Sequence, residues 1–137
     1  MPAIDVVSDA IVVMKWFHAE GEGESMEARA LVEAHRSRTA GLAILDIASY
    51  EVGNALLCGR AGASAGQVAV VLDALSELCT AVSPRAEDFR RAGELAEQQD
   101  LALYDAAYAA VAESNDAELA TLDSAPLDAG LGARPAR

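Results

Sequence analysis

Short apolar runs alternate with longer segments of helical periodicity along the whole chain. The runs are too short for helices, are rich in aliphatic residues and end at polar or turn residues, which favours strands. They span Ile4–Val7, Gly41–Leu45, Thr80–Ser83 and Glu118–Leu122. Between them, apolar residues recur every three or four positions, which predicts helices. These cover residues 10–17, 26–35, 46–58, 64–79, 85–99 and 105–114. The alternation predicts an α/β fold with a parallel sheet between layers of helices.

The chain has the length of one domain. Its 137 residues are enough to bury roughly two-thirds of the surface that an unfolded chain exposes. The sequence has neither an internal repeat nor a composition change that marks a second domain. Residues 129–137 consist largely of Gly, Ala, Arg and Pro, which predicts a loose tail. We therefore expect a single domain over residues 1–128 and a C-terminal tail over residues 129–137.

The composition favours helices and an intracellular protein. Hydrophobic residues make up 53% of the chain and aromatic residues only 4%, and alanine dominates the apolar set, as suits helices. No apolar run approaches the ~18 residues of a membrane span, and the start lacks a signal-peptide pattern. Cys58 and Cys79 have no metal-binding or redox spacing, so we expect buried, reduced thiols. We therefore expect a cytoplasmic location.

The net charge limits how the protein can bind nucleic acid. The chain has 22 acidic and 10 basic residues and a formal charge of −12. This charge excludes nucleic-acid binding through a bulk positive surface. Arg90 and Arg91 lie together on a predicted helix, which is more typical of a solvated helix face than of an RNA contact. Any polyanion must therefore be bound by local contacts.

Four acidic residues lie where the pattern predicts burial or a sheet edge. Glu51 is on the core-facing stripe of its helix, and Asp105 interrupts the most apolar stretch of the chain. Asp9 and Asp123 each directly follow a predicted strand. Each residue also has an ordinary interpretation: Glu51 could reach water at the edge of its stripe, and the three aspartates could cap helices.

The positions of these carboxylates coincide in a parallel sheet. The carboxyl ends of its strands and the amino ends of the following helices share one edge. Carboxylates that meet there repel one another unless a cation lies between them. Oxygen ligands without His or Cys favour Mg²⁺ or Mn²⁺ over zinc. We therefore expect one metal site, formed by Asp9, Glu51, Asp105 and Asp123.

Four segments that contain these residues carry a recognisable pattern. They are Ser8–Phe17 (SDAIVVMKWF), Tyr50–Leu56 (YEVGNAL), Tyr104–Ala110 (YDAAYAA) and Leu119–Asp123 (LATLD). In this order they resemble the signature blocks of PIN-domain ribonucleases, and within that superfamily the VapC toxins of bacterial toxin–antitoxin pairs. The resemblance covers residues 4–127. Aligning the first block on Asp9 rather than Asp5 keeps Lys-Trp-Phe at the family's offset.

The resemblance implies a fold, an activity and partners. The fold is a PIN-like three-layer α/β/α sandwich with a four- or five-stranded, mostly parallel sheet. The activity is endonucleolytic hydrolysis of RNA phosphodiester bonds, dependent on one or two Mg²⁺ or Mn²⁺ ions held by the four carboxylates. Asn54 and Thr121 match supporting positions, where they would orient a carboxylate or a water molecule. The partners are a structured RNA such as tRNA, a VapB-like antitoxin with a basic C-terminal segment, and a second copy in a homodimer.

The sequence departs from the family pattern in two places. Ile11 stands where family members usually have Ser or Thr, and residues 130–137 replace the last β-rich run. The first departure weakens the metal site, and the second predicts a missing or very short edge strand. Two other functions remain open: a catalytically weak PIN domain that acts as a binding or scaffold module, which Ile11 favours, and a general α/β phosphatase or nuclease that acts on DNA.

Overall fold

The computed structural model describes residues 3–16, 30, 33–37, 41–59 and 62–135. The elements are β1 (Val6–Ser8), α1 (Ala10–Trp16), β2 (Leu42–Leu45), α3 (Ile47–Cys58), α4 (Ala65–Leu78), β3 (Thr80–Val82), α5 (Ala86–Gln99), α6 (Leu103–Ser114), β4 (Glu118–Ala120) and α7 (Ser124–Asp128). They agree with the predicted strands and with most of the predicted helices. The helix predicted over residues 26–35 lies largely outside the described residues, although residues 33–36 are helical.

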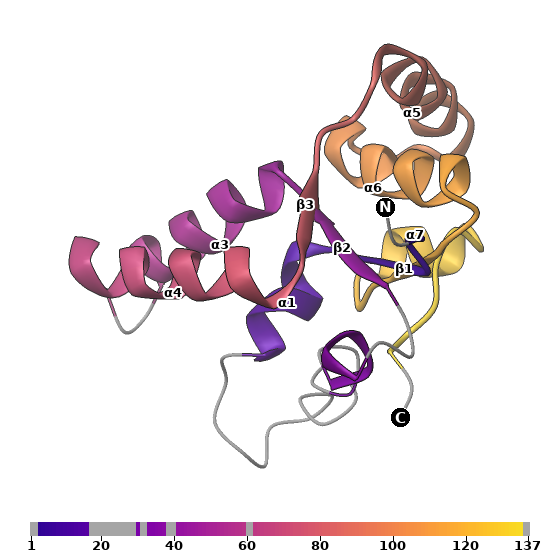
Figure 1. Ribbon diagram of the computed structural model, residues 1–137. Helices are drawn as coiled ribbons and strands as arrows, with labels where there is room; N and C mark the ends of the chain where they lie inside the picture. The colour runs from indigo at the N-terminus through magenta and orange to yellow at the C-terminus, as the bar shows by residue number, and fades with distance from the viewer. Residues whose placement is uncertain (1–2, 17–29, 31–32, 38–40, 60–61, 136–137) are drawn as a thin grey trace.

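The strands form one parallel sheet in the order β3-β2-β1-β4. Figure 1 shows α1, α3 and α4 on one side of this sheet and α5 and α6 on the other. The predicted three-layer α/β/α sandwich is therefore confirmed. Among the described residues, no helix has both the length and the apolar character needed to cross a membrane.

The core explains why the sequence pattern is so apolar in β2 and α6. All four residues of β2 are buried, because helices cover both faces of the sheet and such strands read as continuous apolar runs. In α6, residues 106–112 are all buried, since this helix packs between α5 and the strands β1 and β4. Alanines at most of these positions allow close packing on every side of the helix.

The C-terminal residues return to the sheet. Ala133 forms a parallel bridge with Ala120, and its backbone N–H donates to the Leu119 carbonyl at 2.9 Å. Its carbonyl in turn accepts from the Thr121 backbone N–H at 3.0 Å. The expectation of a loose tail is therefore wrong for the residues around Ala133. The expectation of a very short edge strand is confirmed, because a single bridge takes the place of that strand.

At three places the structure differs from what the sequence pattern indicates. Asp46 stands at the start of α3, but its side chain makes no capping hydrogen bond and instead accepts from Ser83 Oγ at 2.7 Å. Phe89 lies at helical spacing from the buried Ala92 and Leu95 of α5, yet its side chain is half exposed. The two cysteines are free, but only Cys79 is buried and Cys58 is exposed. Burial raises the pKa of the Cys79 thiol to about 12.

Candidate functional site

The sheet order reverses beside β1. The chain goes from β1 to β2 and β3 on one side, and β4 then pairs with β1 on the other side. Ligands of open α/β sheets bind outside the carboxyl ends of the strands at such a switch point. Asp9 directly follows β1, and Asp123 comes three residues after β4. Two of the predicted site residues therefore lie at the position where this topology places ligands.

The four predicted carboxylates line a single pocket of about 170 Å³. Its lining residues are Asp9, Ala10, Ile11, Glu51, Tyr104, Asp105, Tyr108 and Asp123. They come from the start of α1, from α3, from α6 and from the segment after β4. The structure thus brings together side chains that are as much as 114 positions apart in the sequence, from Asp9 to Asp123.

Asp9 is fixed by hydrogen bonds to both of its oxygens. Its Oδ1 accepts from the Val12 backbone N–H at 3.0 Å, and its Oδ2 accepts from the Thr121 hydroxyl. Thr121 meets Asp9 because the residues before them, Ser8 and Ala120, are paired in the sheet. The Thr121 hydroxyl oxygen also accepts from the Asp123 backbone N–H at 3.0 Å. Thr121 is therefore in the position expected for a supporting residue.

Burial raises the pKa of Asp9, and these hydrogen bonds only partly offset the effect. The neighbouring carboxylates of Asp123 and Asp105 raise it further. The pKa of Asp105 is raised as well, first by burial and then by the charges of Asp123 and Glu51. The pocket therefore concentrates negative charge, and a cation placed among these groups would relieve the repulsion.

Asp105 does not cap α6. The residue before this helix is Ala102, and Asp105 is the third helical residue, in the first turn. The capping interpretation of Asp105 is therefore wrong, and its side chain lines the pocket instead. Asp123 does cap a helix: its Oδ1 accepts from the Ala125 backbone N–H at the start of α7, at 3.4 Å.

Glu51 has a partner that the sequence reasoning did not identify. The Tyr108 phenol donates to Glu51 Oε1 at 2.7 Å, which connects α6 to α3. Burial, followed by the hydrogen bond and charge of Glu51, strongly raises the pKa of Tyr108, so the phenol stays a proton donor. The spacing of Asp105 and Tyr108, one helical turn apart, could have indicated that both side chains face the same pocket.

The donor set suits a hard divalent cation, because it consists of carboxylate oxygens. Among the described residues, however, no group of three or more His, Cys, Asp or Glu side chains is close enough to hold a metal ion. Oxygens of Asp9 and Glu51 accept hydrogen bonds from Thr121 and Tyr108 instead. The chemistry of the pocket therefore fits the predicted cation, whereas the ligand set itself remains a prediction.

Two residues considered for the site lie elsewhere. Asn54 is exposed on α3, where its Oδ1 accepts from Cys58 Sγ at 3.5 Å and its side chain lines a different groove. The structure does not bring Asn54 to the acidic pocket. Asp5 precedes β1 and accepts from the Gly41 backbone N–H at 2.6 Å, so it lies at the amino end of the strand. Asp9 is therefore the aspartate of the first block that reaches the pocket.

Several solved structures are similar to this chain. A toxin–antitoxin complex from Klebsiella pneumoniae contains a chain with 20% identity and a TM-score of 0.73, with 96% of this chain and 98% of that chain covered. A protein of Pyrobaculum aerophilum has 25% identity and a TM-score of 0.68, with coverage of 93% and 82%. The Mycobacterium tuberculosis VapC20 toxin, described as cleaving the sarcin–ricin loop, has 18% identity and a TM-score of 0.69, with coverage of 92% and 95%.

Sequence comparison gives a more direct result. Among curated proteins, none matches this chain significantly. The model of the PIN-domain family, in contrast, matches residues 6–129, which include all four carboxylates of the pocket. The chain therefore belongs to the PIN-domain family.

Proposed function

We propose that this protein is an endoribonuclease that hydrolyses RNA phosphodiester bonds with the help of Mg²⁺ or Mn²⁺, and that it is the toxin of a VapBC-type pair. One observation carries the proposal: carboxylates from four separate segments line one pocket at the switch point of the sheet. Membership of the PIN-domain family supports it. So does the structural similarity to a VapC toxin described as cleaving the sarcin–ricin loop.

Asp9, Glu51, Asp105 and Asp123 would hold the cation. A bound divalent ion supplies a nucleophile from water at neutral pH and stabilises the negative charge that develops on the phosphate. Thr121 and Tyr108 orient two of the carboxylates by donating hydrogen bonds to Asp9 and Glu51. Mutation of such a supporting donor typically lowers metal affinity or activity by about 10- to 100-fold. The division of roles is thus four acidic ligands and two neutral positioning residues.

The charge of the chain favours a basic protein partner. With a formal charge of −12, the protein repels RNA at long range and attracts a basic segment. A VapB-like antitoxin would place an arginine among the carboxylates, where its guanidinium can donate two parallel hydrogen bonds. The similarity to a chain of a toxin–antitoxin complex supports this assignment.

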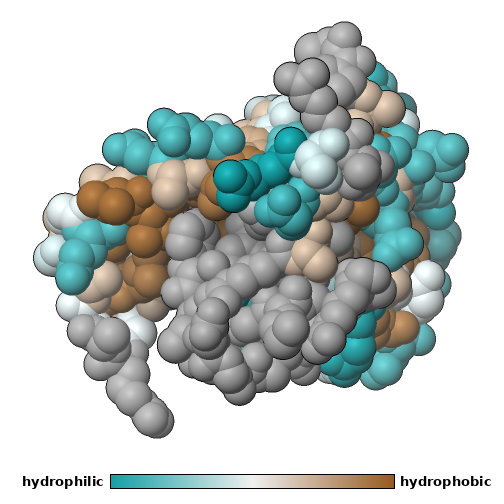
Figure 2. All heavy atoms as spheres, turned by 60° about the horizontal axis from the view of Figure 1, so that its bottom comes forward, coloured by the Kyte–Doolittle hydropathy of each residue, from teal (hydrophilic) through white to brown (hydrophobic). Residues whose placement is uncertain are grey.

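The proposed homodimer has a candidate surface on α3 and α4. Figure 2 shows apolar side chains gathered at the left of the molecule, the side of these two helices. Leu57 is 51% exposed and Val70 is 69% exposed. Exposed apolar patches of this kind are typical of protein–protein interfaces.

A second function, a binding or scaffold module with little activity, is favoured by one observation. Ile11 lines the acidic pocket, where the family usually has a hydroxyl group, and its side chain is half exposed. An aliphatic group offers neither a ligand to a cation nor a donor to a phosphate.

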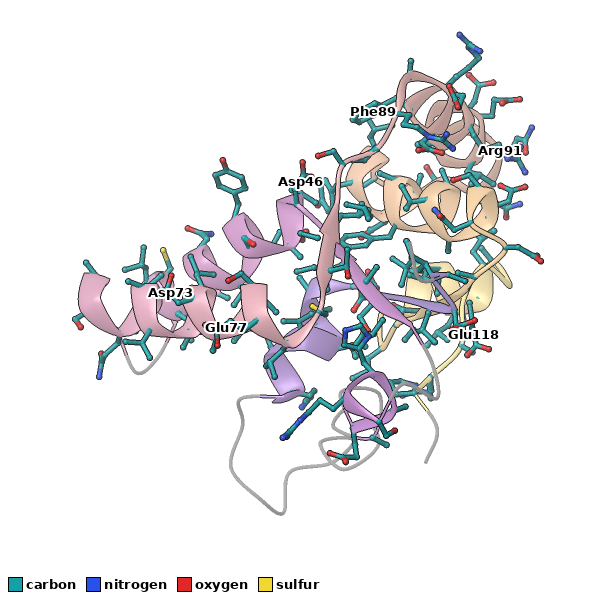
Figure 3. The ribbon with its side chains drawn as sticks, in the orientation of Figure 1. Asp46, Asp73, Glu77, Phe89, Arg91 and Glu118 are labelled. Carbon is teal, nitrogen blue, oxygen red and sulfur yellow. The ribbon has the colours of Figure 1, made fainter. Side chains whose placement is uncertain are left out.

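Metal-dependent cleavage separates the two functions. The substrates are a panel of structured RNAs and matched DNAs with Mn²⁺, and the variants are Asp105→Asn and, as a control, Asp73→Asn. Asp73 is exposed on α4 (Figure 3) and lies outside the pocket. We expect the wild type and Asp73→Asn to cleave RNA, and Asp105→Asn to fall to background. Activity that survives Asp105→Asn contradicts the four-carboxylate site. Calorimetry that detects no divalent-ion binding to the wild type favours the scaffold function.

A further inference from the structure

An apolar pocket lies beside the acidic one. It has a volume of about 340 Å³, within the range of ~300–1,000 Å³ common for ligand pockets. Its lining residues are Leu45, Asp46, Ile47, Pro84, Phe89, Leu103, Tyr104 and Ala107. Three of its large apolar side chains, Phe89, Leu103 and Tyr104, are each about half exposed. Two aromatic rings are therefore accessible at the carboxyl edge of the sheet.

Tyr104 connects the two pockets. It lines both of them and directly precedes Asp105 in α6. A molecule whose phosphate binds to a cation held by the carboxylates can therefore place a neighbouring group against Tyr104 and Phe89. The apolar pocket therefore adjoins the proposed catalytic site at Tyr104.

Phe89 is exposed although its helix has a buried side. Ala92 and Leu95 of α5 are buried against the rest of the protein, whereas Phe89 is 51% exposed. An exposed aromatic ring beside a polar site is a common platform for a nucleobase, because every base has a flat face that can stack. Stacking does not depend on a net positive charge, and the formal charge of this chain is −12.

We propose that this pocket binds the base of an unpaired RNA nucleotide next to the scissile phosphate, stacked on Phe89 and Tyr104. The proposal rests on the proposed ribonuclease function and adds the contact that holds the substrate. Unpaired bases are the parts of a structured RNA that proteins usually recognise, and stacking on aromatic side chains is the usual contact.

Asp46 gives the pocket a preference among bases. Its Oδ2 accepts from the Ser83 hydroxyl at 2.7 Å, which orients the carboxylate at the end of β2. Figure 3 shows Asp46 and Phe89 near this same end of the sheet. An ionised carboxylate only accepts hydrogen bonds, so it favours a base edge with amino donors. Guanine, adenine and cytosine carry an amino group, and uracil does not.

Binding of single nucleotides tests the subsite without any cleavage. The probes are GMP, AMP, CMP and UMP at millimolar concentrations, and binding is followed by the NMR chemical shifts of the backbone amides of residues 45–47, 85–89 and 103–107. All four probes carry the same phosphate, so differences between them report the base. We expect shifts at these amides, with UMP the weakest ligand.

Variants of the pocket residues test which side chains contact the nucleotide. Phe89→Ala should weaken nucleotide binding by at least about fivefold, the lower limit for the loss of one base stack, and Phe89→Trp should restore it. Gln98→Ala removes an exposed neutral side chain from the same helix and should keep the wild-type affinity. Asp46→Asn should reduce the preference for the amino-bearing nucleotides over UMP.

The outcomes separate this proposal from the proposed function. If the wild type cleaves RNA but no mononucleotide shifts the amide signals of the pocket, the proposed base-binding subsite is wrong and the proposed ribonuclease function is kept. The pocket would then bind an apolar side chain of a protein partner. The subsite is equally wrong if Phe89→Ala and Gln98→Ala bind nucleotides alike. If nucleotides bind through Phe89 but the wild type cleaves no RNA with Mn²⁺, the subsite is supported and the ribonuclease function fails.

Discussion

Tyr108 donates a hydrogen bond from its phenol to Glu51 Oε1 at 2.7 Å. The two residues belong to α6 and α3, which lie on opposite sides of the sheet (Figure 1). A hydrogen bond to an ionised group is roughly twice as strong as one between neutral groups. The contact therefore holds the Glu51 carboxylate at the acidic pocket and joins the two helical layers at that point.

Removal of the Tyr108 hydroxyl is expected to weaken the site without unfolding the protein. Tyr108→Phe keeps the buried ring and removes only the donor to Glu51. Loss of such a donor typically costs about 10- to 100-fold in metal affinity or activity. We expect a higher Mn²⁺ concentration for half-maximal RNA cleavage and weaker Mn²⁺ binding in calorimetry.

Tyr50→Phe is the matched control, because the Tyr50 side chain is 79% exposed on α3 and does not line the acidic pocket. This variant should have wild-type Mn²⁺ dependence. If Tyr108→Phe and Tyr50→Phe behave alike, the contact with Glu51 serves only the packing of the two helices.

The metal-free protein should become less stable as the pH rises above the usual range of carboxyl pKa values. The folded-state pKa of Asp9 is raised above its ordinary value of 3.8, mainly by burial. Between the ordinary and the raised pKa the folded state binds more protons than the unfolded state, so stability is lost as the pH rises through this window. Asp9→Asn removes this titration and keeps a side chain of the same size. It should therefore be more stable than the wild type at pH 7 in the presence of a chelator, and the two should converge below pH 3.8.

Urea unfolding at a series of pH values measures this effect. Addition of Mn²⁺ at pH 7 should stabilise the wild type more than Asp9→Asn, because a ligand that binds only the folded state raises its stability. A difference between the two proteins that stays constant with pH would show that burial of Asp9 carries no electrostatic cost.

The buried hydroxyl of Ser8 is expected to destabilise the folded state. Its side chain is fully buried in β1, and its Oγ has no hydrogen-bond partner in the part of the chain that the structure describes. A buried polar group without a partner costs about 1–3 kcal/mol. Ser8→Ala should therefore raise the free energy of unfolding by about 1 kcal/mol. Ser76→Ala, which removes an exposed hydroxyl from α4, should change it by less than about 0.5 kcal/mol. Equal effects of the two variants would refute the cost assigned to Ser8.

Gly132 keeps the C-terminal bridge close to the site. A Cβ atom there would lie 2.8 Å from Thr121 Cγ2 and 2.9 Å from the Leu119 carbonyl oxygen. Gly132→Ala should therefore lower the free energy of unfolding by about 1–3 kcal/mol. It should also reduce RNA cleavage, since Thr121 orients Asp9.

Gly93→Ala provides the opposite case. Gly93 is exposed in the middle of α5, and a Cβ there would meet no atom within 4 Å. Alanine in a helix interior is about 0.5–1 kcal/mol more favourable than glycine, so this variant should be stabilised. Thermal or urea unfolding of both variants measures the contrast, and a stabilised Gly132→Ala would contradict the close packing of the C-terminal residues on β4.

Much of the candidate site could be predicted because the carboxyl ends of parallel strands lie at one edge of the sheet. A residue that closely follows a strand lies near the carboxyl edge of the sheet, so the positions of Asp9, directly after β1, and Asp123, three residues after β4, could be predicted from the sequence. The role of Asp105 as a capping residue was open at that level and proved wrong, because the start of a helix is defined only to within one or two residues by its pattern. Asn54, one turn after Glu51, was expected in the site, yet its side chain lines a different groove.

The sequence by itself determined the order of the strands and of the helices before α7, the parallel sheet and the four acidic positions, because periodicity and local composition depend on neighbours along the chain. Only the tertiary structure decided which side chains meet. The pairing of Ser8 with Ala120 brings Thr121 to Asp9, and the packing of α6 brings Tyr108 to Glu51. The exposure of Phe89 beside Tyr104 is likewise a result of how α5 and α6 pack. These contacts join residues far apart in the sequence, and they depend on register and packing, which no local pattern encodes.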